Sequence, residues 1–143
     1  MVETDVVLAK IATIDRCLAR VADVNGARRE SLLPLDVEDI VVVNLQRAVQ
    51  AAIDLAAHVV ATEGLGLPAD LGDTFTLLEK NGYVEPALAA RLRKMVGFRN
   101  IAVHQYERID PAVVDAIIRK HLSDLSELSR MVLTRFGIGT ARR

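Results

Sequence analysis

Four polar side chains in the last third of the chain stand out by type and spacing: Arg99, Asn100, His104 and Tyr106. If this segment is helical, Asn100 and His104 are i,i+4 neighbours on one face, where the amide can bond one imidazole nitrogen and leave the other free. Arg99 then lies about 140° around the axis from His104 and about 7.5 Å along it. Its long side chain can reach the space in front of that histidine, or meet the histidine of a symmetry mate.

These side chains suit cleavage of a phosphodiester without a metal ion. A neutral imidazole, whose unperturbed pKa is about 6.5, is a general base at neutral pH. Arg99 is a permanently charged, forked donor for phosphate oxygens. RNA supplies its own nucleophile, the 2′-hydroxyl, and a second histidine from a two-fold partner would protonate the leaving 5′-oxygen. Taken alone, however, an arginine and a histidine at this spacing are common, and a lone histidine near a helix end is more often a cap or a surface residue.

Hydrophobic spacing and helix-terminating residues divide the chain into five helical segments. Val7, Ile11 and Ile14 recur at spacings of three and four in the first segment. Pro86 and Pro111 stand where the first turn of a helix accepts proline. We expect helices over about 3–24, 36–63, 73–80, 86–104 and 110–136. Short connections favour antiparallel neighbours, so the sequence predicts an all-α, up-and-down bundle of four long helices plus a short one.

Composition limits the class of protein further. The 143 residues fit one domain, which we expect to span 1–136, with 137–143 as a flexible C-terminal tail. Hydrophobic residues are 51% of the chain but aromatic residues only 3%, which argues against base-stacking platforms. Cys17 is the single cysteine, and His58 and His121 lack ligand partners at metal spacing, so we expect no disulfide, metal or cofactor.

The ends and the hydropathy of the chain indicate the cytoplasm. The first five residues carry two acids where a signal peptide needs positive charge before an apolar run. No uncharged apolar stretch reaches the 18 or so residues that a membrane span requires. We therefore expect a cytoplasmic protein with no membrane contact.

Charge is distributed unevenly although the net charge is only −1. Residues 35–85 hold nine acids and two bases, whereas residues 91–108 hold five bases and one acid, and residues 128–143 hold four arginines and no acid. Such basic patches fit a phosphate-bearing ligand or an acidic partner, and ordinary solvated helix faces fit them equally well.

The second predicted helix is apolar nearly all the way round, which requires cover on most sides. One small bundle offers little cover, so the pattern indicates a second chain. A polar stripe interrupts it, formed by Arg47, Gln50, Asp54 and His58 at spacings of three and four. The stripe is either the solvent face of this helix or a hydrogen-bonded strip that lines a dimer cleft.

Residues 99–106, which read RNIAVHQY, resemble the Arg-x4-His-x-Tyr motif of HepT-like toxins in the HEPN superfamily. The resemblance extends to the long second helix over 44–58, to the turn at 64–68 and to residues 95–98 just before the motif. Phe75, Leu78 and the Ile109-Asp110 pair recur in the same order. It covers roughly residues 5–130.

The resemblance implies an all-helical homodimer in which two copies of the motif face each other across a composite cleft. It implies a metal-independent endoribonuclease in which His104 is the general base or acid, Arg99 stabilises the charged phosphate and Asn100 orients the site. It also implies an MntA-like nucleotidyltransferase antitoxin that transfers AMP to Tyr106. The alternative is a non-catalytic helical module that dimerises and docks a nucleotidyltransferase.

Overall fold

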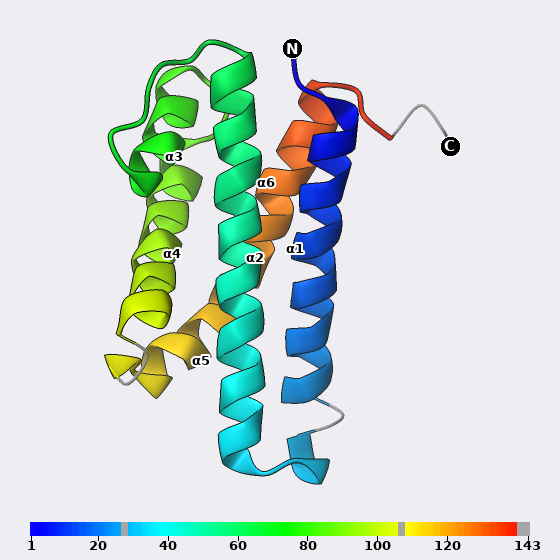
Figure 1. Ribbon diagram of the computed structural model, residues 1–143, viewed down its shortest axis with the longest axis vertical. Helices are drawn as coiled ribbons and strands as arrows, with labels where there is room; N and C mark the ends of the chain where they lie inside the picture. The colour runs from blue at the N-terminus through cyan, green and yellow to red at the C-terminus, as the bar shows by residue number, and fades with distance from the viewer. Residues whose placement is uncertain (27–28, 106–107, 140–143) are drawn as a thin grey trace.

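The computed structural model describes residues 1–26, 29–105 and 108–139, and within them the chain forms six α-helices, one short 3₁₀ turn and no strand (Figure 1). This confirms the predicted all-helical class. The elements are α1 (Thr4–Asn25), η1 (Arg29–Ser31), α2 (Pro34–Thr62), α3 (Leu71–Lys80), α4 (Pro86–His104), α5 (Pro111–Lys120) and α6 (Leu122–Arg135).

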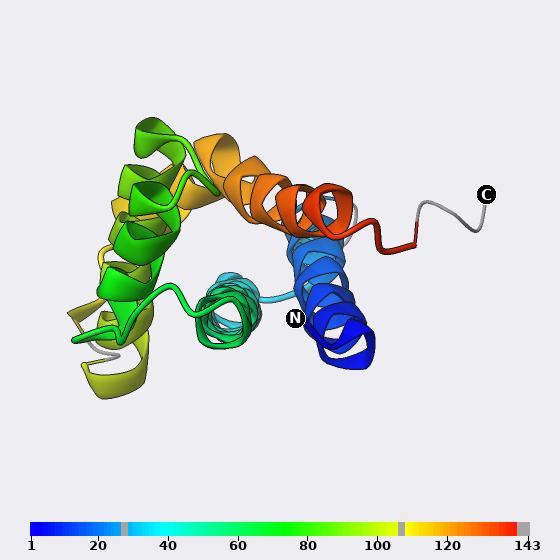
Figure 2. The ribbon, with the colours of Figure 1, turned by 90° about the horizontal axis from the view of Figure 1, so that it is seen from above.

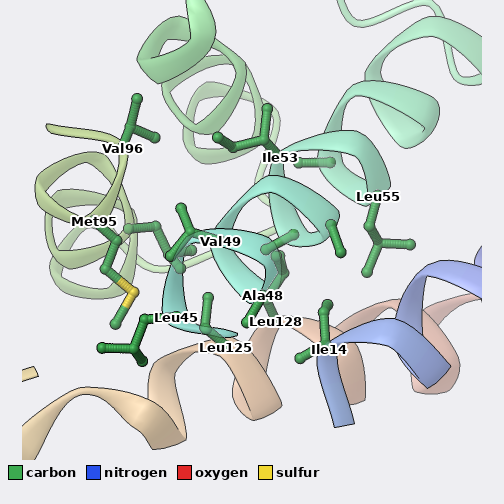
Figure 3. Close-up of a cluster of buried hydrophobic side chains, with 14 of the residues drawn as sticks. Ile14, Leu45, Ala48, Val49, Ile53, Leu55, Met95, Val96, Leu125 and Leu128 are labelled. Carbon is green, nitrogen blue, oxygen red and sulfur yellow. The ribbon is translucent and has the colours of Figure 1, made fainter. Parts of the chain in front are cut away.

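The bundle is organised around α2, which packs against α1, α3, α4 and α6. Seen from above, these four helices form an arch with α2 inside it (Figure 2). The core between them is aliphatic and close-packed, because small side chains such as Ala48 and Ala52, both fully buried, let neighbouring helices approach α2. Figure 3 shows side chains of α1, α2, α4 and α6 in one cluster: Ile14, Leu45, Ala48, Val49, Ile53, Leu55, Met95, Val96, Leu125 and Leu128.

The argument that α2 needs a second chain to cover it is wrong for most of the helix. Thirteen of its 29 residues are buried by the single bundle. The large apolar side chains of α2 that stay exposed are Leu35 at 67% and Val43 at 39%, and both lie in the first half of the helix. A homodimer is compatible with this fold, but burial of α2 does not demand one.

The polar stripe on α2 is largely tied to α1 within the same chain. Asp54 accepts hydrogen bonds from Gln50 Nε2 at 2.9 Å and from Lys10 Nζ at 3.2 Å. The backbone N–H of Glu3 donates to His58 Nε2 at 2.9 Å. Arg47 alone of the stripe is exposed. The stripe is therefore hydrogen-bonded, and its bonds join two helices of one subunit.

By length and composition α2 is the one helix, among the residues searched, that would be able to cross a membrane. However, 56% of its most apolar 18-residue window is buried inside the bundle. A lipid-facing helix would present that surface outward, so the burial is that of a core helix.

The predicted single helix over 110–136 is wrong, because the chain breaks at His121 into α5 and α6. His121 has φ −124° and ψ −1°, outside helical values, and ends one helix while preceding the next. The side chain of Asp124, only 5% exposed, accepts from Arg91 Nε of α4 at 3.0 Å and lies 3.1 Å from His121 Nδ1. No glycine or proline marks this break, so the hydrophobic spacing alone gives no sign of it.

The predicted domain boundary at 136 lies close to the end of α6, and packing continues a little beyond it. The N–H of Ile138 donates to the carbonyl of Leu133 at 2.9 Å, and the Ile138 side chain is buried. Residues 140–143 of the predicted tail lie outside the described residues.

Replacing Asp124 by alanine should lower the free energy of unfolding by about 1–3 kcal/mol, because it leaves Arg91 and His121 without their shared acceptor. Asp115→Ala is the matched control: Asp115 also pairs with an arginine, Arg119, but is 53% exposed. We expect it to cost under about 1 kcal/mol. Urea unfolding followed by circular dichroism, at one protein concentration, measures both. Equal losses in the two variants would contradict a structural role for Asp124.

Candidate active site

The candidate site stands at the C-terminal end of α4. Pro86 opens this helix and His104 is its last residue. The helix is anchored by a buried face that includes Leu92, Met95 and Phe98, which fixes the rotation of the motif residues relative to the core. The carboxylate of Asp110 begins the next helix by accepting from the N–H of Ala112 at 2.9 Å, as its position before Pro111 suggests.

Arg99 carries a charge that no described carboxylate neutralises. Its Nη1 donates to the neutral Oδ1 of Asn100 at 3.0 Å, and its Nε is buried without an acceptor in the described part of the chain. By contrast, Arg91 and Arg93 of the same helix are paired with Asp124 and Glu79. The Arg99 guanidinium is therefore held in place while its charge stays available to an anion.

Asn100 does not bond His104, contrary to the expectation drawn from their i,i+4 spacing. Its side-chain oxygen is instead occupied by the neighbouring Arg99. The arginine side chain is long enough to fold back onto the adjacent residue, and a charged donor makes the stronger bond with an amide oxygen. Within one subunit, the side chain that Asn100 can orient is therefore Arg99 and not His104.

His104 is exposed at the end of α4, and its ring nitrogens make no hydrogen bond with the described residues. It shares no hydrogen bond with Arg99, and neither residue lines the groove between α4 and α5. A helix separates positions five apart by about 140° and about 7.5 Å. One subunit therefore presents the two side chains on different sides of α4.

Tyr106 lies outside the described residues. The residues on either side of that gap, Gln105 and Arg108, are joined by a hydrogen bond from the Arg108 N–H to the Gln105 carbonyl at 2.8 Å. Tyr83, the other tyrosine, lies far along the bundle, where its ring stacks on Phe136 with centroids 6.4 Å apart and lies 3.7 Å from Arg135 Cζ.

A groove that sequence reasoning missed adjoins the site, between α4 and α5. Its volume is about 550 Å³, and its lining combines apolar side chains with several cations. It is lined by Arg91, Lys94, Met95, Gly97, Phe98, Ile101, Arg108, Ile109, Asp110, Ala112, Val113, Ala116, Ile117 and His121. The chain bends at His121, and this bend turns α5 and shapes the groove. Because no glycine or proline marks the bend, the sequence does not predict the groove.

The described residues contain no cluster of three or more histidine, cysteine, aspartate or glutamate side chains that would hold a metal ion. What the site offers chemically is a cation at Arg99 and an unengaged imidazole at His104. This pair can bind a phosphate and transfer a proton.

Fold and motif together define a helical-bundle protein with a basic, histidine-containing site at one helix end. The family described as "Ribonuclease HepT-like" matches residues 14–132. The chain is 39% identical over 123 residues to the mRNA nuclease HepT of Shewanella oneidensis, spanning 86% of this chain and 92% of that protein. The chain therefore belongs to the HepT-like ribonuclease family and is an endoribonuclease.

Solved structures agree with this assignment. One is a tri-AMPylated HEPN toxin of Shewanella oneidensis in complex with its MNT antitoxin, 37% identical, with a TM-score of 0.84 over 91% of this chain and 98% of that one. Another is a toxin–antitoxin pair with AMP-PNP, 36% identical, with the same TM-score and coverage.

Asn100→Asp should slow RNA cleavage about tenfold more than Asn100→Ala, because a carboxylate at this position would pair with Arg99 and compete with the substrate phosphate. Initial rates on a fluorogenic RNA measure the effect. Asn81→Asp, an equal charge change at the exposed end of α3, should keep the parent rate. If Asn100→Asp cleaves as fast as the parent protein, the contact with Arg99 has no bearing on catalysis.

Proposed function

We propose that this chain is the toxin of a toxin–antitoxin pair, an endoribonuclease that needs no metal ion and works as a homodimer. The observation that carries the proposal is that Arg99 and His104, on different sides of the last turns of one helix, form no ion pair with any residue that the structure describes. Family membership indicates RNA cleavage as the reaction. In the proposal, His104 transfers the proton and Arg99 stabilises the charge on the phosphate.

A two-fold dimer completes the site that one subunit leaves open. Arg99 and His104 point to different sides of α4, so Arg99 of one subunit and His104 of the partner subunit would converge where two α4 ends meet. Val103, 45% exposed, lies between them on the helix and would be covered by such a contact.

In the proposed reaction, one His104 removes the proton from the RNA 2′-hydroxyl, and that oxygen attacks the adjacent phosphorus. Arg99 neutralises the charge that develops on the phosphate oxygens. The bond to the 5′-oxygen breaks, and His104 of the partner subunit gives that oxygen a proton. The products are a 2′,3′-cyclic phosphate and a free 5′-hydroxyl, so neither water nor a metal ion enters this step.

The antitoxin in this proposal is an MntA-like nucleotidyltransferase. The phenol oxygen of Tyr106 would attack the α-phosphate of ATP, lose its proton and release pyrophosphate. Each AMP added there brings a phosphate anion within a few residues of Arg99 and Arg108, where it competes with RNA for their positive charge. The tri-AMPylated toxin among the solved relatives supports this form of control.

We further place the protein in the cytoplasm, where its RNA substrate and ATP are found. Residues 1–136 form the toxin domain in this proposal, and residues 137–143 act as a short C-terminal extension of it.

RNA cleavage by the purified protein should persist in excess EDTA and leave 2′,3′-cyclic phosphate ends. Arg99→Ala and His104→Ala should each lower the rate about a hundredfold or more, because each removes a group that acts in the transition state. Arg130→Ala, at an exposed arginine of α6, is the control and should keep the parent rate. Cleavage products analysed by mass spectrometry show the end chemistry.

A His104→Ala protein with full activity would overturn the assignment of this histidine. If the parent protein cleaves none of several RNAs and does not inhibit growth, the chain is instead a non-catalytic docking module for a nucleotidyltransferase.

Co-expression with the nucleotidyltransferase antitoxin should raise the intact mass of the protein by one or more AMP units. Tyr106→Phe should abolish the gain because the acceptor oxygen is gone. Tyr83→Phe should show the full gain, since that ring is held against Arg135 and Phe136 away from the motif. A mass gain in Tyr106→Phe equal to that of the parent would exclude Tyr106 as the acceptor.

A further inference from the structure

One face of α4 leads from the groove between α4 and α5 to the proposed general base. The positions on this face follow one another at spacings of three, four and three: Lys94, Gly97, Ile101 and His104. These spacings keep the four positions within about 80° of one another around the helix axis. The first three line the groove, and His104 ends the helix about 15 Å beyond Lys94. The groove therefore continues into the side of α4 that carries His104.

The cations that line this groove outnumber its carboxylates. Arg91 is paired with Asp124 of α6, and the carboxylate of Asp110 is engaged as the cap of α5. Lys94 and Arg108 also line the groove, are exposed and form no ion pair with any described residue. A phosphate of the substrate can therefore bind either of these two side chains without displacing a carboxylate.

The two unpaired cations stand at different distances from His104. The N–H of Arg108 donates to the carbonyl of Gln105 at 2.8 Å, which holds Arg108 close to the end of α4 where His104 lies. Lys94 is almost three helical turns further back on the same helix. One cation is thus next to the proposed base, and the other is about 15 Å away along the groove side of α4.

The surface between these cations is open and apolar. Gly97 has no side chain, and a Cβ at this position would meet nothing within 4 Å. Ile101 and Val113 are 42% and 46% exposed. The groove volume of about 550 Å³ lies within the range of about 300–1,000 Å³ that holds small organic molecules, so the sugar and base of a nucleotide fit. Its one aromatic ring, Phe98, is buried, so bases would lie here without stacking on it.

RNA is the occupant that these observations favour, because a substrate strand at His104 continues beyond the bond that is cleaved. The groove side of α4 starts at that residue, and its unpaired cations match the next phosphates of the strand. An apolar floor accepts the faces of unpaired bases, which a duplex keeps covered. Contacts with phosphates fix the position of a strand without reading its bases.

We propose that Lys94 and Arg108 are positioning residues that bind phosphates of a single-stranded RNA segment next to the cleaved bond. The sugars and bases of this segment lie over Gly97 and Ile101. This inference rests on the proposed cleavage at His104. It adds the path that the RNA takes over the subunit.

The test is the salt dependence of RNA cleavage by the full-length protein. Lys94→Gln and Arg108→Gln each remove one charge and should raise KM about threefold or more at low salt. We expect kcat to stay within about twofold of the parent, because contacts away from the reacting bond hold substrate and transition state equally. In a plot of log(kcat/KM) against log[KCl], each variant should lose about 0.7 of the slope, the amount per phosphate contact with a single strand.

Gly97→Leu tests the path without changing charge. Its side chain should obstruct the strand, so KM should rise while the salt slope stays that of the parent. Leucine is a better helix former than glycine, so thermal unfolding should occur at the parent temperature or higher. If this variant does not fold, the two charge variants still decide the question.

Two matched variants control for the loss of a charge elsewhere. Lys80→Gln removes an exposed lysine at the last residue of α3, and Arg130→Gln removes an exposed arginine of α6. Both should keep the KM, the kcat and the salt slope of the parent.

Parent-like KM and salt slope in both charge variants would overturn the proposal, and the two cations would then serve another partner, such as an acidic protein. A fall in kcat with unchanged KM would also overturn it, because the side chains would then act at the reacting bond or on the fold. Parent-like KM in a folded Gly97→Leu protein would exclude the path over this face.

Binding of 2′-O-methyl RNA, which lacks the attacking hydroxyl, separates the path from the cleavage chemistry. Fluorescence anisotropy measures its dissociation constant for the parent, His104→Ala and both charge variants. If the charge variants bind more weakly but His104→Ala cleaves RNA at the parent rate, the path stands and the assignment of His104 fails. If His104→Ala is inactive and the charge variants bind and cleave like the parent, only the path is wrong.

Discussion

The packing of α2 against four other helices is the constraint on which the site depends. An aliphatic helix with fully buried Ala48 and Ala52 draws α1, α4 and α6 into contact and fixes the rotation of α4 about its axis. That rotation buries Met95 and Phe98, and it leaves the last turn of α4 with Ile101 and His104 outward. The candidate site therefore follows from core packing, because its residues are ones that the core leaves uncovered.

Electrostatics then distinguishes the arginines of α4 from one another. Arg91 forms an ion pair with Asp124 of α6, and Arg93 forms one with Glu79 of α3, so both arginines link α4 to a neighbouring helix. Among the described residues, the hydrogen-bond partner of Arg99 is the neutral amide of Asn100. A guanidinium with a carboxylate partner would have to exchange that partner for a phosphate, whereas the proposed binding of an anion by Arg99 would need no such exchange. Arginines of α4 that face a carboxylate therefore hold helices together, and Arg99, which faces a neutral amide, is the one proposed to bind a phosphate.

The helix starts could be predicted from the sequence, because proline and capping residues act on the backbone next to them. Features that depend on contacts between distant residues could not be predicted in this way. Pro86, Pro111 and Asp110 mark their helix starts through backbone geometry and capping, and the structure places them there. The break at His121 depends on a carboxylate pairing with Arg91 of another helix, which no local pattern records. Likewise, helix spacing predicts a hydrogen bond between Asn100 and His104. In the structure the side-chain oxygen of Asn100 accepts from Arg99 instead.

The break at His121 also makes the angle between α5 and α6 depend on one anion. Asp124 of α6 bonds Arg91 of α4 and lies against His121, the residue between α5 and α6, so one carboxylate connects α4 to the point where the chain bends. Loss of this carboxylate by substitution would remove both contacts that hold α5 at its present tilt. The wall of the groove next to the candidate site therefore keeps its shape through one side chain on a different helix.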